Sequence, residues 1–361
     1  MSEIHDCPGG PPPSAGPLRH AAERALRLAT AYQASRALHA ALRLNLPDLL
    51  ADGPLAADNL ARLAGAHAPS LRRVLRALAA YGVFSEAADG RFALGPLGAA
   101  LRTGAAGSVR DLALMWGDED YWVTWGELER CVRTGRTAAD LLFGAEDAFR
   151  RYAADARFGE VFNAGMTALS ATVAAAVVAA YDFPADGVVV DVGGGRGRLI
   201  ADILRARPGL RGVLIDLPGV VEGAPRLLAE AGVADRCEVV GGDMFAGVPE
   251  GGNLYVLSRV IDSFDEARAV SVLATCRRAM EGAGRGQRLL LVEPVLPDRI
   301  EATASPTVQE DMLMDLTMLV RTGGCERTEA EYRAFLTAAG LRLDRVIPTR
   351  AAVSLVEATP A

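Results

Sequence analysis

The sequence contains no lysine, and its last histidine is His67. Histidine is the side chain whose ordinary pKa lies closest to neutral pH, and it is also the commonest metal ligand in proteins. Any general acid or base beyond residue 67 must therefore be a carboxylate or another group that is not histidine. A histidine-based metal site is excluded from that part of the chain, and we predict no metal site.

Cysteine is also scarce and unpaired. The five cysteines are Cys7, Cys131, Cys237, Cys276 and Cys325, and no two of them form a CxxC pair. An odd number at wide spacing argues against a disulfide framework and against a zinc site. We therefore expect a reducing, cytoplasmic environment.

An excess of basic charge is missing as well. The net charge is −7 and the isoelectric point about 5.3, which disfavours a nucleic-acid partner and an anionic membrane surface. Residues 1–17 are rich in proline and glycine and lack the pattern of a signal peptide, so they indicate a disordered tail. The alanine-rich run at 171–181 is expected to be too short to span a bilayer.

A chain of 361 residues predicts about two domains. Residues 18–112 have a helical pattern, with a long amphipathic helix over 21–44 and another over about 69–81. A hairpin follows, in which the strands 82–87 and 91–95 flank the turn signal Asp89-Gly90. Helices followed by a two-stranded hairpin predict a winged-helix domain.

Such a domain either reads DNA or packs against a second copy of the chain. The helix before the hairpin carries Arg72, Arg73 and Arg76, yet it offers no Asn, Gln or Lys to read bases. Its apolar surface favours a homodimer formed through this domain. A transcription regulator remains the alternative.

Residues 113–185 are predicted to be helical again. All three tryptophans fall here, at Trp116, Trp122 and Trp125, together with Tyr121. These rings either pack in a core or form the wall of a pocket for a flat organic molecule.

From residue 186 the pattern changes to strands that alternate with helices. Apolar strands are predicted within 187–193, 212–217, 237–244, 254–261 and 288–296, and a closing antiparallel hairpin within 341–349 and 351–358. Continuous apolar strands separated by helices indicate an α/β fold with a doubly wound, Rossmann-like sheet. We assign this domain to residues 186–361.

The strongest local motif is DVGGGRG, which follows the first of these strands. Gly193, Gly195 and Gly197 give the spacing GxGxG, whereas a dinucleotide fold has GxGxxG aimed at a pyrophosphate. Asp191 precedes the glycines, and an acid there repels phosphate but suits a cationic amine. The motif therefore favours an amine-bearing nucleoside.

The next two strands also end in acids. Asp216-Leu217 ends the second strand and suits ribose hydroxyls, and Asp243-Met244-Phe245 follows the third and suits an adenine ring. Each acid taken singly is as readily a helix cap. Three acids at successive strand ends, with nothing for phosphate, predict a site for S-adenosylmethionine (SAM).

The chain resembles the class I SAM-dependent O-methyltransferases of the caffeate/hydroxyindole type, including bacterial antibiotic-tailoring enzymes. The motifs DVGGGRG, DLPGVV, GDMF, DEARAV, LLLVEPVLP and GGCERTEAEY occur in that family's order. The resemblance implies a winged-helix dimerisation domain, a helical pocket-lining region over 113–185 and a methyltransferase domain. It also implies these cofactor-binding residues: Asp191, Gly193, Gly195, Gly197, Asp216, Leu217, Asp243, Met244, Phe245 and Ser258.

The chain departs from the family at the catalytic position. The family carries its histidine in a His-Asp-Trp signature, whereas this sequence has Asp262-Ser263-Phe264. Two supporting acids of the family match Glu293 and Glu326. Asp262 then acts as a base for an acidified hydroxyl, only orients the acceptor, or marks a protein that has lost methyl transfer.

The resemblance also implies a pocket for an aromatic or polyketide-like secondary metabolite. Its implied lining is Trp116, Trp125, Phe162, Met166, Arg259, Met314 and Met318. Arg259 either offsets the neighbouring acids or binds an acidic substrate, and Arg321 is a candidate to face an anionic group. O-methylation is the predicted reaction, with N- or C-methylation as the alternative. The absence of lysine and the abundance of Ala and Arg fit a GC-rich bacterial source.

Overall fold

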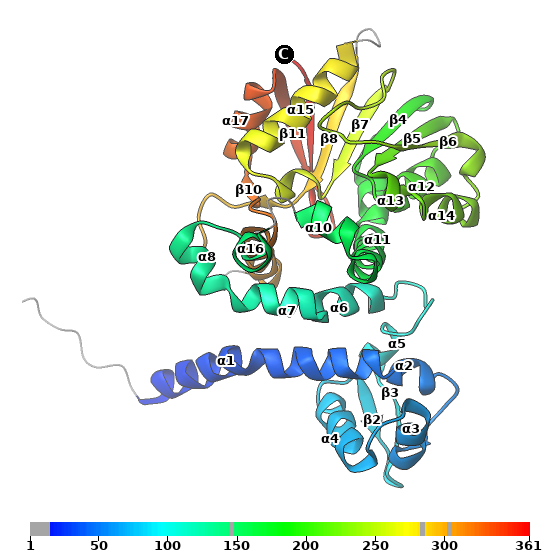
Figure 1. Cartoon of the computed structure of the whole chain (residues 1–361), viewed down its shortest axis with the longest axis vertical. Helices are drawn as coiled ribbons and strands as arrows, with labels where there is room; N and C mark the ends of the chain where they lie inside the picture. Colours follow the sequence, from blue (N-terminus) through cyan, green and yellow to red (C-terminus); the bar gives the residue numbers. More distant parts are fainter. Residues whose placement is uncertain (1–14, 145–147, 282–285, 302–304) are drawn as a thin grey trace, which may run out of the picture. The chain divides into compact units, whose positions relative to one another are not determined.

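The computed structural model describes residues 15–144, 148–281, 286–301 and 305–361 (Figure 1). It divides into two compact units, one ending at Ala105 and the other spanning Ala106–Ala361. The predicted boundary at residue 112 lies inside the second unit, and the predicted pocket-lining region at 113–185 belongs to that unit. Residues 1–14 of the predicted tail lie outside the described residues, and residues 15–17 form the start of α1.

The first unit has the predicted winged-helix arrangement. Its elements are α1 (Ala15–Arg43), α2 (Leu46–Leu49), β1 (Leu55–Ala56), α3 (Ala57–Ala64), α4 (Ala68–Ala79), β2 (Phe84–Glu86), β3 (Arg91–Leu94) and α5 (Pro96–Ala99). The β2–β3 hairpin is antiparallel, with Phe84 opposite Leu94 and Gly90 at a φ of 79° in the turn. The short strand β1 adds a third member that the sequence pattern did not indicate.

The arginines of α4 lie beside the hairpin. Arg72 and Arg76 both pair with the Glu86 carboxylate, at 3.2 and 3.1 Å. The hairpin therefore neutralises part of the positive charge of α4. The side chains from Arg19 to Gln33 of α1 are exposed, among them Leu26, Leu28 and Tyr32.

The second unit begins with a helical region and continues into a sheet. The helices before the sheet are α6 (Arg110–Gly117), α7 (Glu119–Gly126), α8 (Leu128–Thr134), α9 (Ala138–Phe143), α10 (Ala148–Ala154) and α11 (Ala156–Ala180). The strands are β4 (Gly187–Val192), β5 (Leu210–Asp216), β6 (Cys237–Gly241), β7 (Leu254–Ser258), β8 (Arg288–Glu293), β9 (Val295–Leu296), β10 (Arg327–Thr328), β11 (Leu341–Pro348) and β12 (Ser354–Pro360). Between them lie α12 (Arg198–Ala206), α13 (Pro218–Val221), α14 (Ala224–Glu230), η1 (Ala234–Arg236), η2 (Ile261–Ser263), α15 (Glu266–Glu281), α16 (Pro306–Arg321) and α17 (Glu329–Ala338).

The large sheet has the order β11-β12-β8-β7-β4-β5-β6. Strands β4 to β8 pair in parallel, whereas β12 runs antiparallel to both β8 and β11. The predicted doubly wound sheet and its antiparallel closing hairpin are therefore confirmed. Because parallel strands end at one edge, the segments that follow β4, β5, β6 and β7 meet there.

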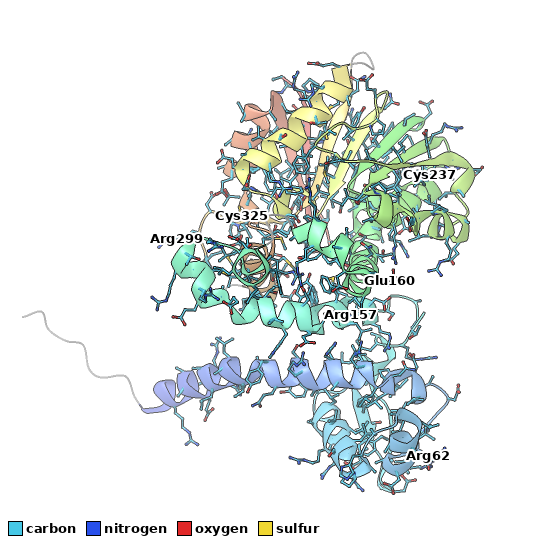
Figure 2. All side chains as sticks on the ribbon, viewed as in Figure 1. Arg62, Arg157, Glu160, Cys237, Arg299 and Cys325 are labelled. Atoms are coloured by element: carbon cyan, nitrogen blue, oxygen red, sulfur yellow. The ribbon has the colours of Figure 1, made fainter. Side chains whose placement is uncertain are left out.

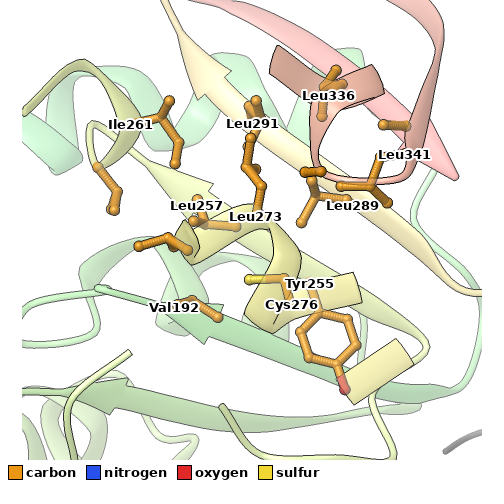
Figure 3. Close-up of a cluster of buried hydrophobic side chains, with 14 of the residues drawn as sticks. Val192, Tyr255, Leu257, Ile261, Leu273, Cys276, Leu289, Leu291, Leu336 and Leu341 are labelled. Carbon is orange, nitrogen blue, oxygen red and sulfur yellow. The ribbon is translucent and has the colours of Figure 1, made fainter. Parts of the chain in front are cut away.

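Buried side chains alternate between the two faces of the sheet, as the period-2 geometry of a strand requires. On one face, Leu289 and Leu291 of β8 pack with α15 and α17 (Figure 3). On the other face, Leu290 and Val292 pack with α11, α12 and α14. The helices therefore cover both faces and leave the carboxyl edge of the strands free for a ligand.

Helix α11 corrects one expectation. The alanine-rich run extends into a helix of 25 residues, and within the described part of the chain this helix is long and apolar enough to cross a membrane by length and composition. The charged residues near the alanine-rich run had suggested a shorter apolar segment than the helix that forms. In the structure α11 packs against α6 and α12, so its apolar surface serves the second unit.

Candidate active site

A cavity of about 740 Å³ lies at the carboxyl edge of the sheet in the second unit. Its lining comes from the segments after β4, β5, β6 and β7, and from α6, α7, α10, α11 and α16. This size accommodates a nucleoside and a small organic molecule together. The three predicted acids, Asp191, Asp216 and Asp243, all line it.

The glycine turn shapes one wall. Gly193, Gly195 and Gly197 have φ values of 69°, 61° and 80°, a region that residues with a Cβ rarely adopt. A Cβ on Gly193 would lie 2.8 Å from a Val260 methyl group, whereas one on Gly195 would meet open space. Gly193 and Gly195 line the cavity, and Gly197 instead caps α12 without lining it.

Asp216 ties the turn to the end of β5. Its Oδ2 accepts a hydrogen bond from the Gly195 amide at 2.8 Å, and its Oδ1 accepts one from the Leu217 amide at 2.7 Å. Each carboxylate oxygen keeps a further lone pair, so the group is held in place while it can still accept from a diol. Burial raises the pKa of Asp216, and the two amide hydrogen bonds oppose that rise.

Asp191 lies beneath the turn. It is only 1% exposed, and within the described residues neither carboxyl oxygen has a hydrogen-bond partner. Burial, and then the neighbouring Asp216 carboxylate, raise its pKa to about 7. A buried acid without a partner is costly, so this side chain favours a cationic or hydrogen-bonding group in the cavity.

The segment after β6 supplies a flat apolar surface. Asp243 accepts a hydrogen bond from the Phe245 amide at 2.9 Å, which fixes the turn that presents Met244 and Phe245. The Phe245 ring meets the Phe264 ring edge-on at 5.1 Å, and the Arg268 guanidinium lies 4.9 Å from the Phe245 centroid. Ser258, half-buried at the end of β7, lines the same region.

The positions and chemistry of these residues fit SAM. The unpartnered Asp191 suits its ammonium group, Asp216 suits its ribose diol, and Phe245 suits its adenine. Gly195 lines the cavity, and a Cβ on it would meet only open space, so its bare backbone leaves that space to a ligand.

A second group of charges lies beyond the end of β7. Asp262 is 3% exposed and lines the cavity, and its Oδ1 accepts a hydrogen bond from the Ser263 hydroxyl at 3.1 Å. Arg259 donates to Glu326 Oε1 at 3.1 Å and lies 3.9 Å from Asp262 Oδ2. Glu293 Oε1 accepts from the Val260 and Ile261 amides at 3.0 and 3.1 Å. We call Arg259, Asp262, Glu293 and Glu326 the carboxyl cluster.

The carboxyl cluster brings together the three predicted catalytic acids, but they differ in position. Only Asp262 and Arg259 line the cavity, whereas Glu293 and Glu326 lie behind them. Glu293 is fully buried, and one oxygen of Glu293 and one of Glu326 have no hydrogen-bond partner among the described residues. The two glutamates therefore support Asp262 rather than touch a ligand.

Burial dominates the electrostatics of the carboxyl cluster. Burial raises the pKa of Asp262, and the Arg259 guanidinium opposes that rise. Burial and the Asp262 carboxylate raise the pKa of Glu326 to about 9, and the same two causes raise that of Glu293 well above its ordinary value. One guanidinium cannot balance three carboxylates, so burial favours the protonated form within the carboxyl cluster and Arg259 opposes it.

The proton on Glu326 has a consequence for stability. A carboxyl whose pKa is higher in the folded state stabilises the fold below its unfolded pKa of 4.5, and this contribution is lost as pH rises towards 9. Glu326→Gln mimics the protonated form. Between pH 4.5 and pH 9 we expect the free energy of unfolding of this variant to rise relative to that of the wild type, by at most about 1.4 kcal/mol per pH unit.

Urea denaturation at both ends of that range measures the difference. Glu250→Gln, at an exposed position, is the matched control and should run parallel to the wild type. A constant difference between Glu326→Gln and the wild type would mean that Glu326 is ionised in the folded protein.

Most residues of the predicted acceptor pocket lie in the rest of the cavity wall. They are Trp116, Phe162, Met166, Arg259, Met314 and Met318. Trp125 is not among the residues that line the cavity and packs against Cys131, Ala138 and Val320 instead. On a helix the neighbouring positions face different directions, and composition alone cannot choose between them.

Several residues that matter here were not predicted as site residues, although Gly324 and Arg327 lie within the motif GGCERTEAEY. Arg327 is 2% exposed and donates to the Ile261 and Phe264 carbonyl oxygens at 2.8 and 2.7 Å, which fixes the turn that carries Asp262. Gly324 lies against the same turn, so that a Cβ there would be 2.0 Å from the Asp262 carbonyl oxygen. Phe149 and Tyr152 of α10 also line the cavity.

No group of three or more His, Cys, Asp or Glu side chains able to hold a metal ion occurs in the ranges that the structure describes. The four cysteines in those ranges are free thiols, and Cys7 lies outside them.

Comparison with known families and proteins gives a consistent result. Residues 125–342 match the O-methyltransferase domain, and residues 26–104 match the O-methyltransferase dimerisation domain. The phenazine O-methyltransferase PhzM of Lysobacter antibioticus is 42% identical over 335 residues, which is 93% of this chain and 95% of that protein.

Solved structures agree with these matches. The crystal structure of LaPhzM has a TM-score of 0.88 and 40% identity, and the match covers 94% of this chain and 99% of that one. CalO1, a methyltransferase in calicheamicin biosynthesis solved with S-adenosylhomocysteine (SAH) bound, has a TM-score of 0.79 and 37% identity, with 95% and 98% covered.

Proposed function

The chain belongs to the SAM-dependent O-methyltransferase family, and from this premise we propose that it methylates a hydroxyl oxygen on a flat secondary metabolite. The observation that carries the proposal is one cavity with two ends. Asp191, Asp216 and Phe245 form a nucleoside cradle at one end, and Asp262 and the apolar wall form an acceptor site at the other.

The cradle residues hold and orient the cofactor. Asp216 accepts hydrogen bonds from the ribose diol, Asp191 meets the ammonium group, and Phe245 stacks on the adenine. Bound SAM supplies an electrophilic methyl group. Positioning of two reactants in a cavity that excludes water accounts for much of the acceleration in such a transfer.

Asp262 is the group that receives the proton of the acceptor hydroxyl. Its Oδ1 is engaged by the Ser263 hydroxyl, which leaves Oδ2 to accept the proton. An ordinary aspartate is a weak base for a phenol, but burial raises the pKa of Asp262 and narrows that gap. Arg259, which contacts both Asp262 and Glu326, favours the ionised form of the residue that faces the cavity.

Asp262→Asn tests this assignment. The amide keeps the shape of the side chain and cannot take a proton, so we expect kcat at neutral pH to fall by about 10²–10⁴-fold. Raising the pH should restore part of the activity, because the acceptor hydroxyl then ionises by itself. The measurement is a pH series with an acceptor identified by a mass gain of one methylene group.

Asp265→Asn is the matched control, since Asp265 is exposed and caps α15 through the Arg268 amide. A small, pH-independent loss in Asp262→Asn would refute the role as base. That result would favour an orienting role and a nitrogen acceptor, because an amine presents its lone pair without a base. Calorimetry that shows no saturable SAM binding would overturn the transferase proposal as a whole.

We also infer that the protein works as a cytoplasmic homodimer. Residues 26–104 match a dimerisation domain, and the exposed Leu26, Leu28 and Tyr32 of α1 supply apolar surface for a second copy of the chain. The free thiols of the described cysteines suit a reducing compartment.

A further inference from the structure

A buried polar network lines the acceptor end of the cavity and takes no part in the steps above. Arg321, at the end of α16, is 3% exposed. Its guanidinium donates to Thr124 Oγ1 at 3.1 Å, to Asp120 Oδ1 at 2.9 Å and to the Tyr152 hydroxyl oxygen at 2.7 Å. It also stacks on the Tyr121 ring at 3.7 Å. Arg321 is thus fixed from several sides.

The charges in this network do not cancel. Asp120 pairs with Arg321 and also with Arg151, so two guanidinium groups share one carboxylate. Asp118, the neighbouring acid in the chain, is occupied by Arg157 at 2.7 Å. The group formed by Arg151, Asp120 and Arg321 therefore has a net charge of +1 beside the cavity. A buried positive excess favours an anionic ligand.

One hydrogen-bond donor of the network, the Tyr152 hydroxyl, has no acceptor among the described residues. A guanidinium only donates, so the Tyr152 oxygen accepts from Arg321. Burial raises the pKa of Tyr152, so the hydroxyl stays protonated. No described residue accepts a hydrogen bond from this hydroxyl, and Tyr152 lines the cavity. Its hydrogen is available to a molecule bound there.

Aromatic rings connect this donor to the turn that carries Asp262. The Tyr152 ring lies 4.8 Å from Phe162 and 5.8 Å from Phe149, and Phe149 lies 6.0 Å from Phe264, two residues beyond Asp262. A flat molecule on this wall has Asp262 towards one end and Tyr152 towards the other.

We propose that Tyr152, held by Arg321, determines specificity by donating a hydrogen bond to a carboxylate of the acceptor. The substrate class is then a hydroxylated aromatic acid, with the hydroxyl at Asp262 and the carboxylate at Tyr152. This inference rests on the proposed function, because it assumes that the acceptor occupies this end of the cavity. It also changes the role expected for Arg321. Arg321 polarises Tyr152 and adds positive charge, but its guanidinium does not bind the anion through two parallel N–H groups.

The test is a binding comparison between two probes, 6-hydroxy-2-naphthoate, which carries its hydroxyl and carboxylate at opposite ends, and 2-naphthol, measured by calorimetry on the full chain saturated with SAH. The wild type should bind the acid at least about tenfold more tightly, since a hydrogen bond to a charged group is stronger than one between neutral groups. Tyr152→Phe should remove that preference and leave the affinity for 2-naphthol unchanged. Tyr255→Phe removes a buried hydroxyl that bonds to Pro249 away from the cavity, and it should keep the preference.

The outcomes separate the two proposals. Wild-type protein that binds SAH but shows no preference for the acid overturns this inference and leaves the proposed transferase intact. An acid preference that survives in Tyr152→Phe overturns the role of Tyr152. Failure of the wild type to bind SAH overturns the proposed function itself. If Tyr152→Phe does not fold, the wild-type comparison of the two probes still decides whether the acid is preferred.

Discussion

Arg259→Met is expected to move the acid limb of the activity profile to higher pH and to lower the free energy of unfolding by about 3–5 kcal/mol. Arg259 is the guanidinium of the carboxyl cluster, and it lowers the pKa values of Asp262, Glu293 and Glu326. Without it these carboxyls hold their protons to higher pH. A larger fraction of Asp262 is then protonated at a given pH, and that fraction cannot accept a proton from the acceptor.

The sign of the stability change with pH follows from the same shift. A carboxyl with a raised folded pKa stabilises the fold when protonated, so the variant loses stability as pH rises through that pKa. Arg259 also has a φ of 55°, a left-handed conformation that is unusual for a side chain of this size. The backbone thus accepts strain to bring this cation to the cluster.

Kinetic pH profiles and urea denaturation at several pH values measure both effects. Arg211→Met, on the exposed surface of β5, is the matched control and should change neither. An unshifted acid limb in Arg259→Met would show that the cluster does not set the protonation state of the catalytic group.

Gly324→Ala is expected to lower kcat by about 10²-fold or more, although it adds a single methyl group. The new Cβ would lie 2.0 Å from the Asp262 carbonyl oxygen, 2.5 Å from the Ser263 carbonyl carbon and 2.6 Å from the Phe264 nitrogen. All three are backbone atoms, so the turn itself must move. Overpacking of this kind costs about 1–3 kcal/mol of stability and displaces Asp262 from the cavity wall.

The measurement compares kcat and SAM affinity in the variant and the wild type. SAM affinity should change little, because the cradle lies on other segments. Gly126→Ala is the matched control, since Gly126 ends α7 in open space and has an ordinary φ. Normal turnover in Gly324→Ala would mean that the position of the 261–264 turn does not limit the reaction.

The sequence was most informative where local chemistry decides the structure. The β2–β3 hairpin follows from Asp89-Gly90, and the glycine turn follows from three glycines that all adopt positive φ. The acids at the ends of β4 and β5 line the cavity because parallel strands end at one edge of a sheet. These features depend on residues close together in the chain.

Features that depend on contacts between distant residues could not be predicted. Trp125 was placed in the pocket because its segment lines the acceptor pocket in the resembled family, yet its position on α7 turns it towards Val320. The network of Arg321 joins residues 120, 124 and 152, and no spacing in the sequence relates them. Arg327 and Gly324 lie in the motif GGCERTEAEY, but the motif does not reveal that they contact the backbone of the Asp262 turn.

The end of β8 limits how this enzyme can change in length. Glu293 closes a strand whose side chains alternate between two cores, and it holds the Val260 and Ile261 amides. Inserting or deleting one residue within Arg288–Glu293 would exchange the two faces and detach the carboxylate from its amides. Related enzymes should therefore vary in the connections between strands and keep this strand at constant length, and designers of new variants face the same restriction.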